Sequence, residues 1–136
     1  MDLNRTPPQI ADTASEEIRA LNHLTLTNIE QVYPQPATVS DTATALGLLL
    51  QRLPQTLDQL EAGLQLLDRS GKIRLDTKPL GATLDEDIAQ EVASVSSALA
   101  ETRRLLRRAA TSMADATGPL SHMGGMWDDV EEGAQP

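Results

Sequence analysis

Few residues in this chain have the types and spacing that catalysis or metal binding requires. The two histidines, His23 and His122, are far apart, and neither has another histidine or a cysteine at metal-ligand spacing. Asp85, Asp87 and Glu91 offer carboxylates to a cation, but acids crowded at a helix start serve more often as caps. We therefore expect no catalytic residues, no metal, no cofactor and no small-molecule substrate.

Ser70-Gly71-Lys72 shares three residues with a phosphate-binding loop, but it lacks the upstream glycine and the strand-to-helix context. We interpret it as a helix stop, because glycine favours the left-handed position that ends a helix.

A cluster of four arginines carries charge rather than reactive chemistry. It consists of Arg103, Arg104, Arg107 and Arg108. One interpretation is a phosphate-binding face for DNA; the other is a solvated outer face that complements the dipole of a helix with acids at its start. We favour the second, because the chain has a net charge of −9, which disfavours nucleic acid.

The only tryptophan lies in an acidic stretch without apolar periodicity. One interpretation is an incidental tail residue, or one that folds back on the bundle. The other is a linear motif, an aromatic anchor with acidic flanks for an apolar, basic groove. The motif would comprise Met126, Trp127, Asp128, Asp129 and Glu131.

The chain contains two long heptad patterns of apolar residues, and the helices that they predict would position the arginine cluster. Apolar residues recur at alternating steps of four and three, which places them on one stripe of a helix. We expect these stripes to be the core seams and, where uncovered, interaction surfaces. The main seam residues are Leu46, Leu50, Leu53, Leu57, Leu60, Leu64, Leu67, Ile88, Val92, Val95, Leu99, Leu106 and Met113.

Helix signals predict three helices, at about 14–32, 39–70 and 84–117. A threonine followed three residues later by an acid, as in a capping box, precedes each at Thr13, Thr38 and Thr83. Pro54 either kinks or breaks the second helix, and we favour a kink because the leucine register passes through it in phase.

The predicted fold is all-α: one short helix and a long antiparallel hairpin with coiled-coil-like seams. Residues 1–12 are expected to form a flexible N-terminus, 13–118 the helical bundle and 119–136 a disordered acidic tail. The segment 71–82 is expected to be a loop held by Ile73 and Leu75, with a short extended segment as the alternative.

Composition narrows the function further. The chain of 136 residues has no cysteine, one Trp, one Tyr and no Phe. No apolar run is long enough to span a bilayer, and residues 1–10 contain no hydrophobic block, so a cytoplasmic protein with no membrane partner is expected.

Trp127 and Glu131 have the aromatic-to-acid spacing found near the C-terminus of type VII secreted (WXG100-like) helical-hairpin proteins, which this chain resembles in size and helical character. The resemblance implies a secreted helical hairpin. The chain departs from that class at Ser70-Gly71-Lys72, where a Trp-x-Gly turn is absent.

The function predicted from the residues is non-enzymatic protein interaction, as a self-assembling scaffold, an adaptor or an inhibitor. The first helix is too short to cover the hairpin, so some apolar surface is left for another chain. We expect a homo-oligomer, with a dimer favoured, or a different helical partner. A secreted type VII protein and a DNA-associated protein using the arginine face are the alternatives.

Overall fold

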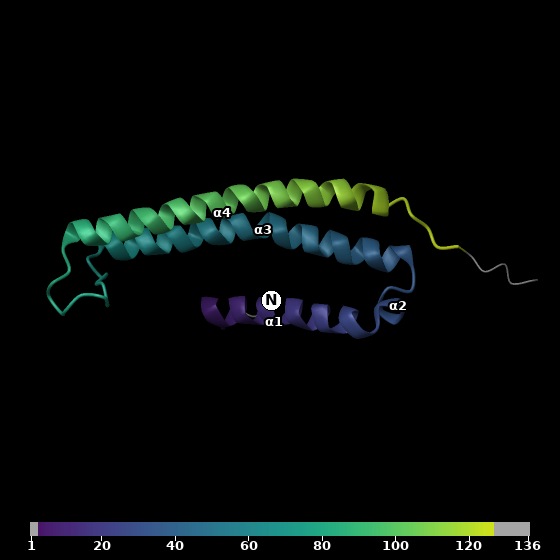
Figure 1. Ribbon diagram of the computed structural model, residues 1–136, viewed down its shortest axis with the longest axis horizontal. Coiled ribbons are helices and arrows are strands. Elements are labelled where there is room, and N and C mark those ends of the chain that lie inside the picture. The colour runs from purple at the N-terminus through teal and green to yellow at the C-terminus, as the bar shows by residue number, and fades with distance from the viewer. Residues whose placement is uncertain (1–2, 127–136) are drawn as a thin grey trace, which may run out of the picture.

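The chain folds into α-helices joined by short segments (Figure 1). The structure, a computed structural model, describes residues 3–126, and these contain four helices and no strand. They are α1 (Pro7–Thr27), α2 (Ile29–Val32), α3 (Pro36–Arg69) and α4 (Asp85–Leu120). The helices α3 and α4 pack side by side and antiparallel along nearly their whole length. The predicted all-α fold with a long hairpin is confirmed.

Prolines, not threonines, mark the starts of the first two long helices. Helix α1 begins at Pro7, and the backbone N–H of Thr6 donates to Gln9 Oε1 at 2.9 Å. Thr13 is already inside the helix, where its hydroxyl donates to the Gln9 carbonyl at 2.8 Å. The expected start near residue 14 is therefore wrong, and residues 7–12 are helical rather than a flexible N-terminus. Proline suits the first helical turn, because its φ is preset and its missing donor is not needed there.

The other two threonine boxes are displaced in the same way. Helix α3 starts at Pro36, so Thr38 lies within its first turn. Helix α4 starts at Asp85, and the Leu84 N–H donates to Asp87 Oδ2 at 3.3 Å. The hydroxyl of Thr83 instead accepts a bond from the Leu75 N–H of the preceding loop, at 3.3 Å. Each box lay close to a helix start without forming its cap.

The stop at Ser70-Gly71 is confirmed. Gly71 has a φ of 64°, its N–H donates to the Asp68 carbonyl at 2.9 Å, and the Lys72 N–H donates to the Leu67 carbonyl at 3.0 Å. This pair of bonds satisfies the last carbonyls of α3 with glycine in the left-handed conformation. Residues 71–82 then form a loop with no strand, in which Ile73 and Leu75 are half-buried.

Two prolines lie inside helices. Pro54 is buried within α3, which is continuous from Pro36 to Arg69, so the helix does not break there. Each internal proline removes one backbone hydrogen bond, and the remaining hydrogen bonds keep the helix continuous on both sides of it. Helix α4 likewise runs past Gly118 to Leu120, with Pro119 in its last turn. The expected stop at 117 is therefore three residues early.

The hairpin packs through a stripe that shares alternate members with the expected seams and differs from them by one residue at the other positions. We call it the inner stripe: it consists of half-buried or buried residues that recur every three or four positions. On α3 these are Ala43, Gly47, Leu50, Pro54, Leu57, Glu61, Leu64 and Asp68. On α4 they are Ile88, Val92, Ser96, Leu99, Arg103, Leu106, Ala110, Met113, Thr117 and Leu120.

Small residues bring the two hairpin helices close together. Ala43, Gly47 and Pro54 are the buried residues of α3. A Cβ placed on Gly47 would lie 3.6 Å from Met113 Cγ, so the methionine of α4 already packs on the glycine backbone. Gly47 and Pro54 take the places that the expected seam gave to Leu46 and Leu53.

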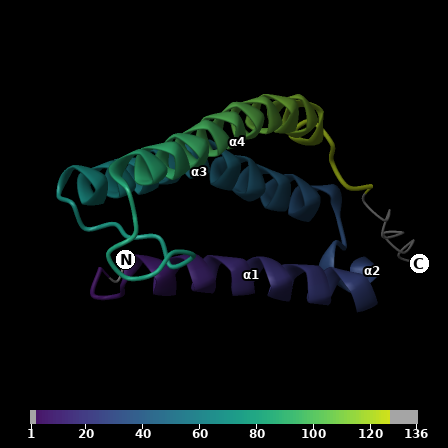
Figure 2. The same cartoon turned by 60° about the vertical axis from the view of Figure 1, so that its left-hand side comes forward.

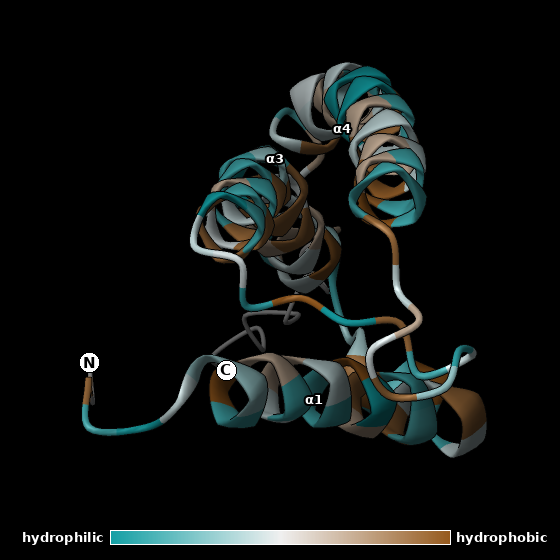
Figure 3. Cartoon of the chain, turned by 90° about the vertical axis from the view of Figure 1, so that its left-hand side faces the viewer, coloured by the Kyte–Doolittle hydropathy of each residue, from teal (hydrophilic) through white to brown (hydrophobic). Residues whose placement is uncertain are grey.

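Helix α1 lies apart from the hairpin. It runs alongside α3 in the opposite direction, and its helix contacts are chiefly with α2 rather than with α3 or α4 (Figure 2). Ile18, Leu21 and Thr25 are half-buried, but α1 contains no fully buried residue. Hydrophobic residues occur along all three long helices (Figure 3), and some of them are exposed on each, such as Leu24, Leu66 and Leu105.

Candidate interaction surface

An apolar groove of about 840 Å³ lies between α3 and α4 near the turn of the hairpin. No charged side chain lines it. We call it the apolar groove. Its lining consists of Thr56, Gln59, Leu60, Gly63, Leu64, Leu66 and Leu67 of α3, Val95 and Leu99 of α4, and Pro7 at the start of α1.

The rotation of the hairpin interface creates this groove. The expected register placed Leu60, Leu67 and Val95 in the core, but they are 59%, 46% and 42% exposed. Leu50, Leu57, Leu64, Leu99 and the other residues shared by both registers are half-buried as predicted. Leu46 and Leu53 are half-buried at the edge of the inner stripe. The misplaced leucines and valine thus form the side of the hairpin instead of its centre.

The apolar groove lies beside the first residue of α1. Helix α1 has 21 residues and α3 has 34, a difference that corresponds to about 20 Å of helix. Pro7 lines the groove, so the first residue of α1 lies at its edge. The prediction that the short helix cannot cover the long hairpin is consistent with this arrangement.

Sequence reasoning missed the part that Gly63 plays in the groove. A Cβ at Gly63 would meet no atom within 4 Å, so the groove is open above this position. A glycine in a helix interior, between leucines, was the available signal. Leu66, which is 58% exposed, lies outside the predicted seam.

The sequence predicted that Arg103 lies on the outer face of its helix, and the structure shows that this is wrong. Its guanidinium Nη1 donates to Glu61 Oε2 at 2.5 Å, and its Nε lies 3.1 Å from Asp58 Oδ1. The Arg103 and Glu61 side chains are only 13% and 16% exposed. Hydrogen bonds from Arg103 and from Ser96 lower the pKa of Glu61. Arg103 therefore joins the two hairpin helices.

The rest of the arginine cluster is more exposed. Arg104 makes two bonds to Glu101 one turn earlier, at 2.7 and 2.6 Å, and this hydrogen bonding lowers the pKa of Glu101. In the described part of the chain no ion pair involves Arg107 or Arg108, and both are exposed. The cluster is thus divided, with two of its four charges paired to acids.

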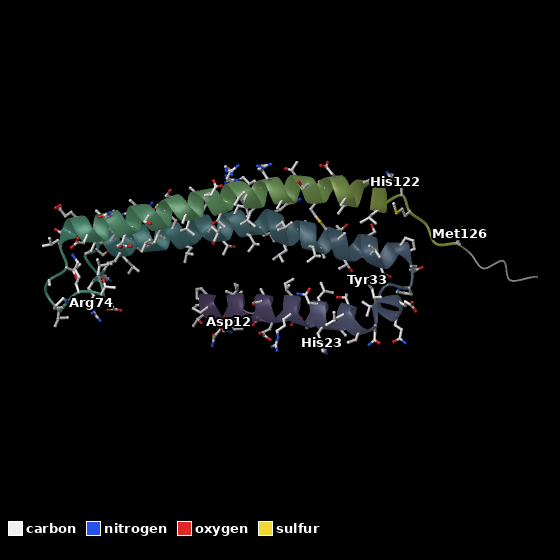
Figure 4. The ribbon with its side chains drawn as sticks, in the orientation of Figure 1. Asp12, His23, Tyr33, Arg74, His122 and Met126 are labelled. Atoms are coloured by element: carbon white, nitrogen blue, oxygen red, sulfur yellow. The ribbon has the colours of Figure 1, made fainter. Side chains whose placement is uncertain are left out.

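The acids at the start of α4 act locally. Asp87 pairs with Lys78 of the loop and accepts the Leu84 N–H; these bonds lower the pKa of its carboxyl group. Across residues 3–126 no group of three or more histidines, cysteines or acids is arranged to hold a metal ion. His23 lies on α1 and His122 lies beyond the end of α4, so they share no site (Figure 4).

The predicted tail motif lies almost entirely outside the described residues. Met126 is 97% exposed. Trp127, Asp128, Asp129 and Glu131 fall beyond residue 126, and the interpretation of this segment as a motif stays a prediction.

Comparison with known proteins identifies no relative. No protein-family model, no curated protein and no solved structure matches the chain. Among residues 3–126, no helix combines the length and apolar character needed to cross a membrane.

Proposed function

We propose that this protein is a non-enzymatic protein-interaction module whose binding surface is the apolar groove. The observation that carries the proposal is the exposure of Leu60, Leu66 and Leu67 side by side in an uncharged groove. Burying a leucine that is otherwise exposed contributes roughly 1.5–3 kcal/mol, so several together provide a substantial driving force for association. Contiguous apolar surface of this kind marks binding sites on proteins that are otherwise covered by polar groups.

The geometry of the groove favours a helical ligand. It lies between two antiparallel helices, and a third helix laid along them buries its own apolar stripe at the usual interhelical spacing. Helix α1 already runs beside the hairpin up to Pro7, and a helix from a partner would continue the third layer beyond that point.

A photo-crosslinking residue in place of Leu60 tests this proposal in cells that naturally make the protein. We expect a covalent adduct with a protein, either a second copy or another chain, because a helical ligand would lie within a few ångströms of position 60. The same residue in place of Leu105, which is exposed on α4 but does not line the groove, should give little adduct. Equal yields at both positions, or none at either, would refute the proposal.

The two alternatives from the sequence gain no supporting observation. Trp127 and Glu131, which carry the type VII resemblance, are outside the described residues. Arg103 and Arg104 of the DNA-binding alternative are engaged by acids of the chain itself.

A further inference from the structure

We infer that a second copy of this chain covers the apolar groove. The α3 and α4 helices of one copy would pack antiparallel against those of the other at the hairpin ends, about a two-fold axis near Gly63. This inference rests on the proposed function and names its partner. Each copy would cover Leu60, Leu66, Leu67 and Val95 of the other.

The accessible surface of the single chain supports an oligomer. It is 11121 Å², whereas a compact folded monomer of 14.6 kDa exposes about 6,900 Å². Twelve residues lie outside 3–126, and they contribute at most about 1,900 Å² to the accessible surface. Subtracting this amount and the compact-monomer value from the surface of the chain leaves an excess of more than about 2,000 Å². A standard stable interface buries about 1,600 Å² in total over both partners. This surplus belongs to the chain as a whole, in which α1 lies apart from the hairpin, and pairing of two hairpin ends would bury part of it.

The core of the single chain is correspondingly small. Ala43, Gly47 and Pro54 are the only buried residues within 3–126, and no large side chain there is fully buried. A structure with so little core gains much of its stability from association, as obligate homodimers do. Two-fold dimers are the commonest closed assemblies of soluble proteins.

The shape of the chain fits this symmetry. Helix α3 extends about 20 Å beyond the start of α1, which leaves a step beside Pro7. In an antiparallel pair related by a two-fold axis near Gly63, the hairpin end of each copy occupies the step of the other. The tip of each hairpin then meets the N-terminal end of the partner's α1, and both grooves are covered at once.

Charge does not oppose this pairing, although each chain has a net charge of −9. The groove contains no charged residue, so no like charges meet in the contact. Two acids on α3, Glu61 and Asp58, are paired with Arg103 of their own chain. Repulsion between more distant charges is screened over about 8 Å at physiological salt.

The oligomeric state of the purified protein tests the inference. We expect light scattering at micromolar concentration to give twice the chain mass of 14.6 kDa. Leu60→Asp should convert the protein to a monomer, because the two-fold axis would bring two new charges into an apolar contact. Leu105→Asp adds the same charge at an exposed leucine outside the groove and should leave the dimer intact.

A cysteine crosslink locates the axis even if Leu60→Asp fails to fold. The chain has no cysteine, and Gly63 has open space around a Cβ, so Gly63→Cys introduces a single thiol without a clash. Mild oxidation should convert most of this variant to a covalent dimer, whereas Leu105→Cys should remain largely uncrosslinked. A monomeric wild-type protein, a dimer unaffected by Leu60→Asp in a folded variant, or equal crosslinking at the two positions would overturn the inference. A monomeric protein that still forms an adduct with a different protein through position 60 would overturn the inference while leaving the proposed function in place.

Discussion

Glu61 and Arg103 form a polar contact at a position where a leucine-zipper pattern would place an apolar side chain. Both lie in the inner stripe, and Ser96 provides a further hydrogen bond to the carboxylate. A pair of this kind fixes how two helices are aligned, because a shift of either helix separates the charges. Removing one partner of a poorly exposed pair leaves the other charge without compensation, which destabilises the fold.

Glu61→Gln should therefore lower the thermal midpoint in a pH-dependent manner. The pKa of Glu61 in the folded protein lies below its ordinary value of 4.5. Its stabilisation is therefore fully present above that pH and is lost as the pH falls through the lowered pKa. The difference between wild type and variant should be constant near neutral pH and shrink in more acidic solution. Thermal melts followed by circular dichroism from pH 7 to pH 3 measure it.

Glu16→Gln is the matched control for this experiment. Glu16 pairs with Arg19 on the exposed surface of α1, where ion pairs contribute little. A Glu61 effect that is no larger than the Glu16 effect, or that does not change with pH, would refute a stabilising role for the pair.

Two glycines should respond in opposite ways to alanine. Gly47→Ala should stabilise the protein by about 0.5–1 kcal/mol, because the new methyl group makes an ordinary contact with Met113 and alanine favours a helix. Gly71→Ala should destabilise it by about 1–2 kcal/mol, because the φ of 64° at this position is unfavourable for any residue with a Cβ. Urea unfolding of both variants measures the difference. The same sign for both would contradict the assigned roles.

At the scale of helices, the main lesson is the rotation of the hairpin interface. Heptad spacing identifies a broad apolar side of α3 and α4, but the stripe that forms the interface departs from the most apolar one at positions such as Gly47 and Glu61. Packing selects the stripe that contains Ala43, Gly47 and Pro54, because small residues allow the backbones to approach. The larger side chains then remain available at the side of the hairpin.

Truncation of one leucine from each location distinguishes the two stripes. Leu57→Ala should cost about 2 kcal/mol, since Leu57 is half-buried in the inner stripe and its loss leaves a gap against α4. Leu105→Ala should change stability by less than about 0.5 kcal/mol, because Leu105 is exposed outside the groove. Chemical denaturation gives both values, and equal losses would mean that the rotated register is wrong.

At the scale of the whole molecule, α1 is the weakest part of the fold. It contacts chiefly α2, and most of the stability of a helix in a protein comes from packing of its apolar face against other elements. We expect amide hydrogens of α1 to exchange much faster than those in the centre of α3 and α4. Hydrogen–deuterium exchange followed by peptide mass spectrometry tests this on the full chain. Protection of α1 equal to that of α3 would show that α1 packs far more tightly than its contacts indicate.

Local interactions made several features predictable from the sequence alone. The all-α class, the long hairpin and the glycine stop at Gly71 follow from apolar spacing and backbone conformation within a few residues. The prediction that the first helix is too short follows from the lengths of the apolar patterns. The starts of the first two long helices were placed seven and three residues late, because a proline in the first turn marks each of them instead of the threonine box, whereas the start of α4 differs by one residue.

Only the tertiary structure decided which stripe of each helix faces the other. The observed and expected stripes share alternate members, such as Leu50, Leu57 and Leu64, and differ by one position at the others, so the spacing of residues alone could not separate them. Close approach at Gly47 and the pairing of Glu61 with Arg103 settle the choice, and both depend on residues far apart in the chain. The same choice left Leu60, Leu67 and Val95 exposed beside the hairpin core, because two helices that pack through one stripe cannot also bury its neighbour.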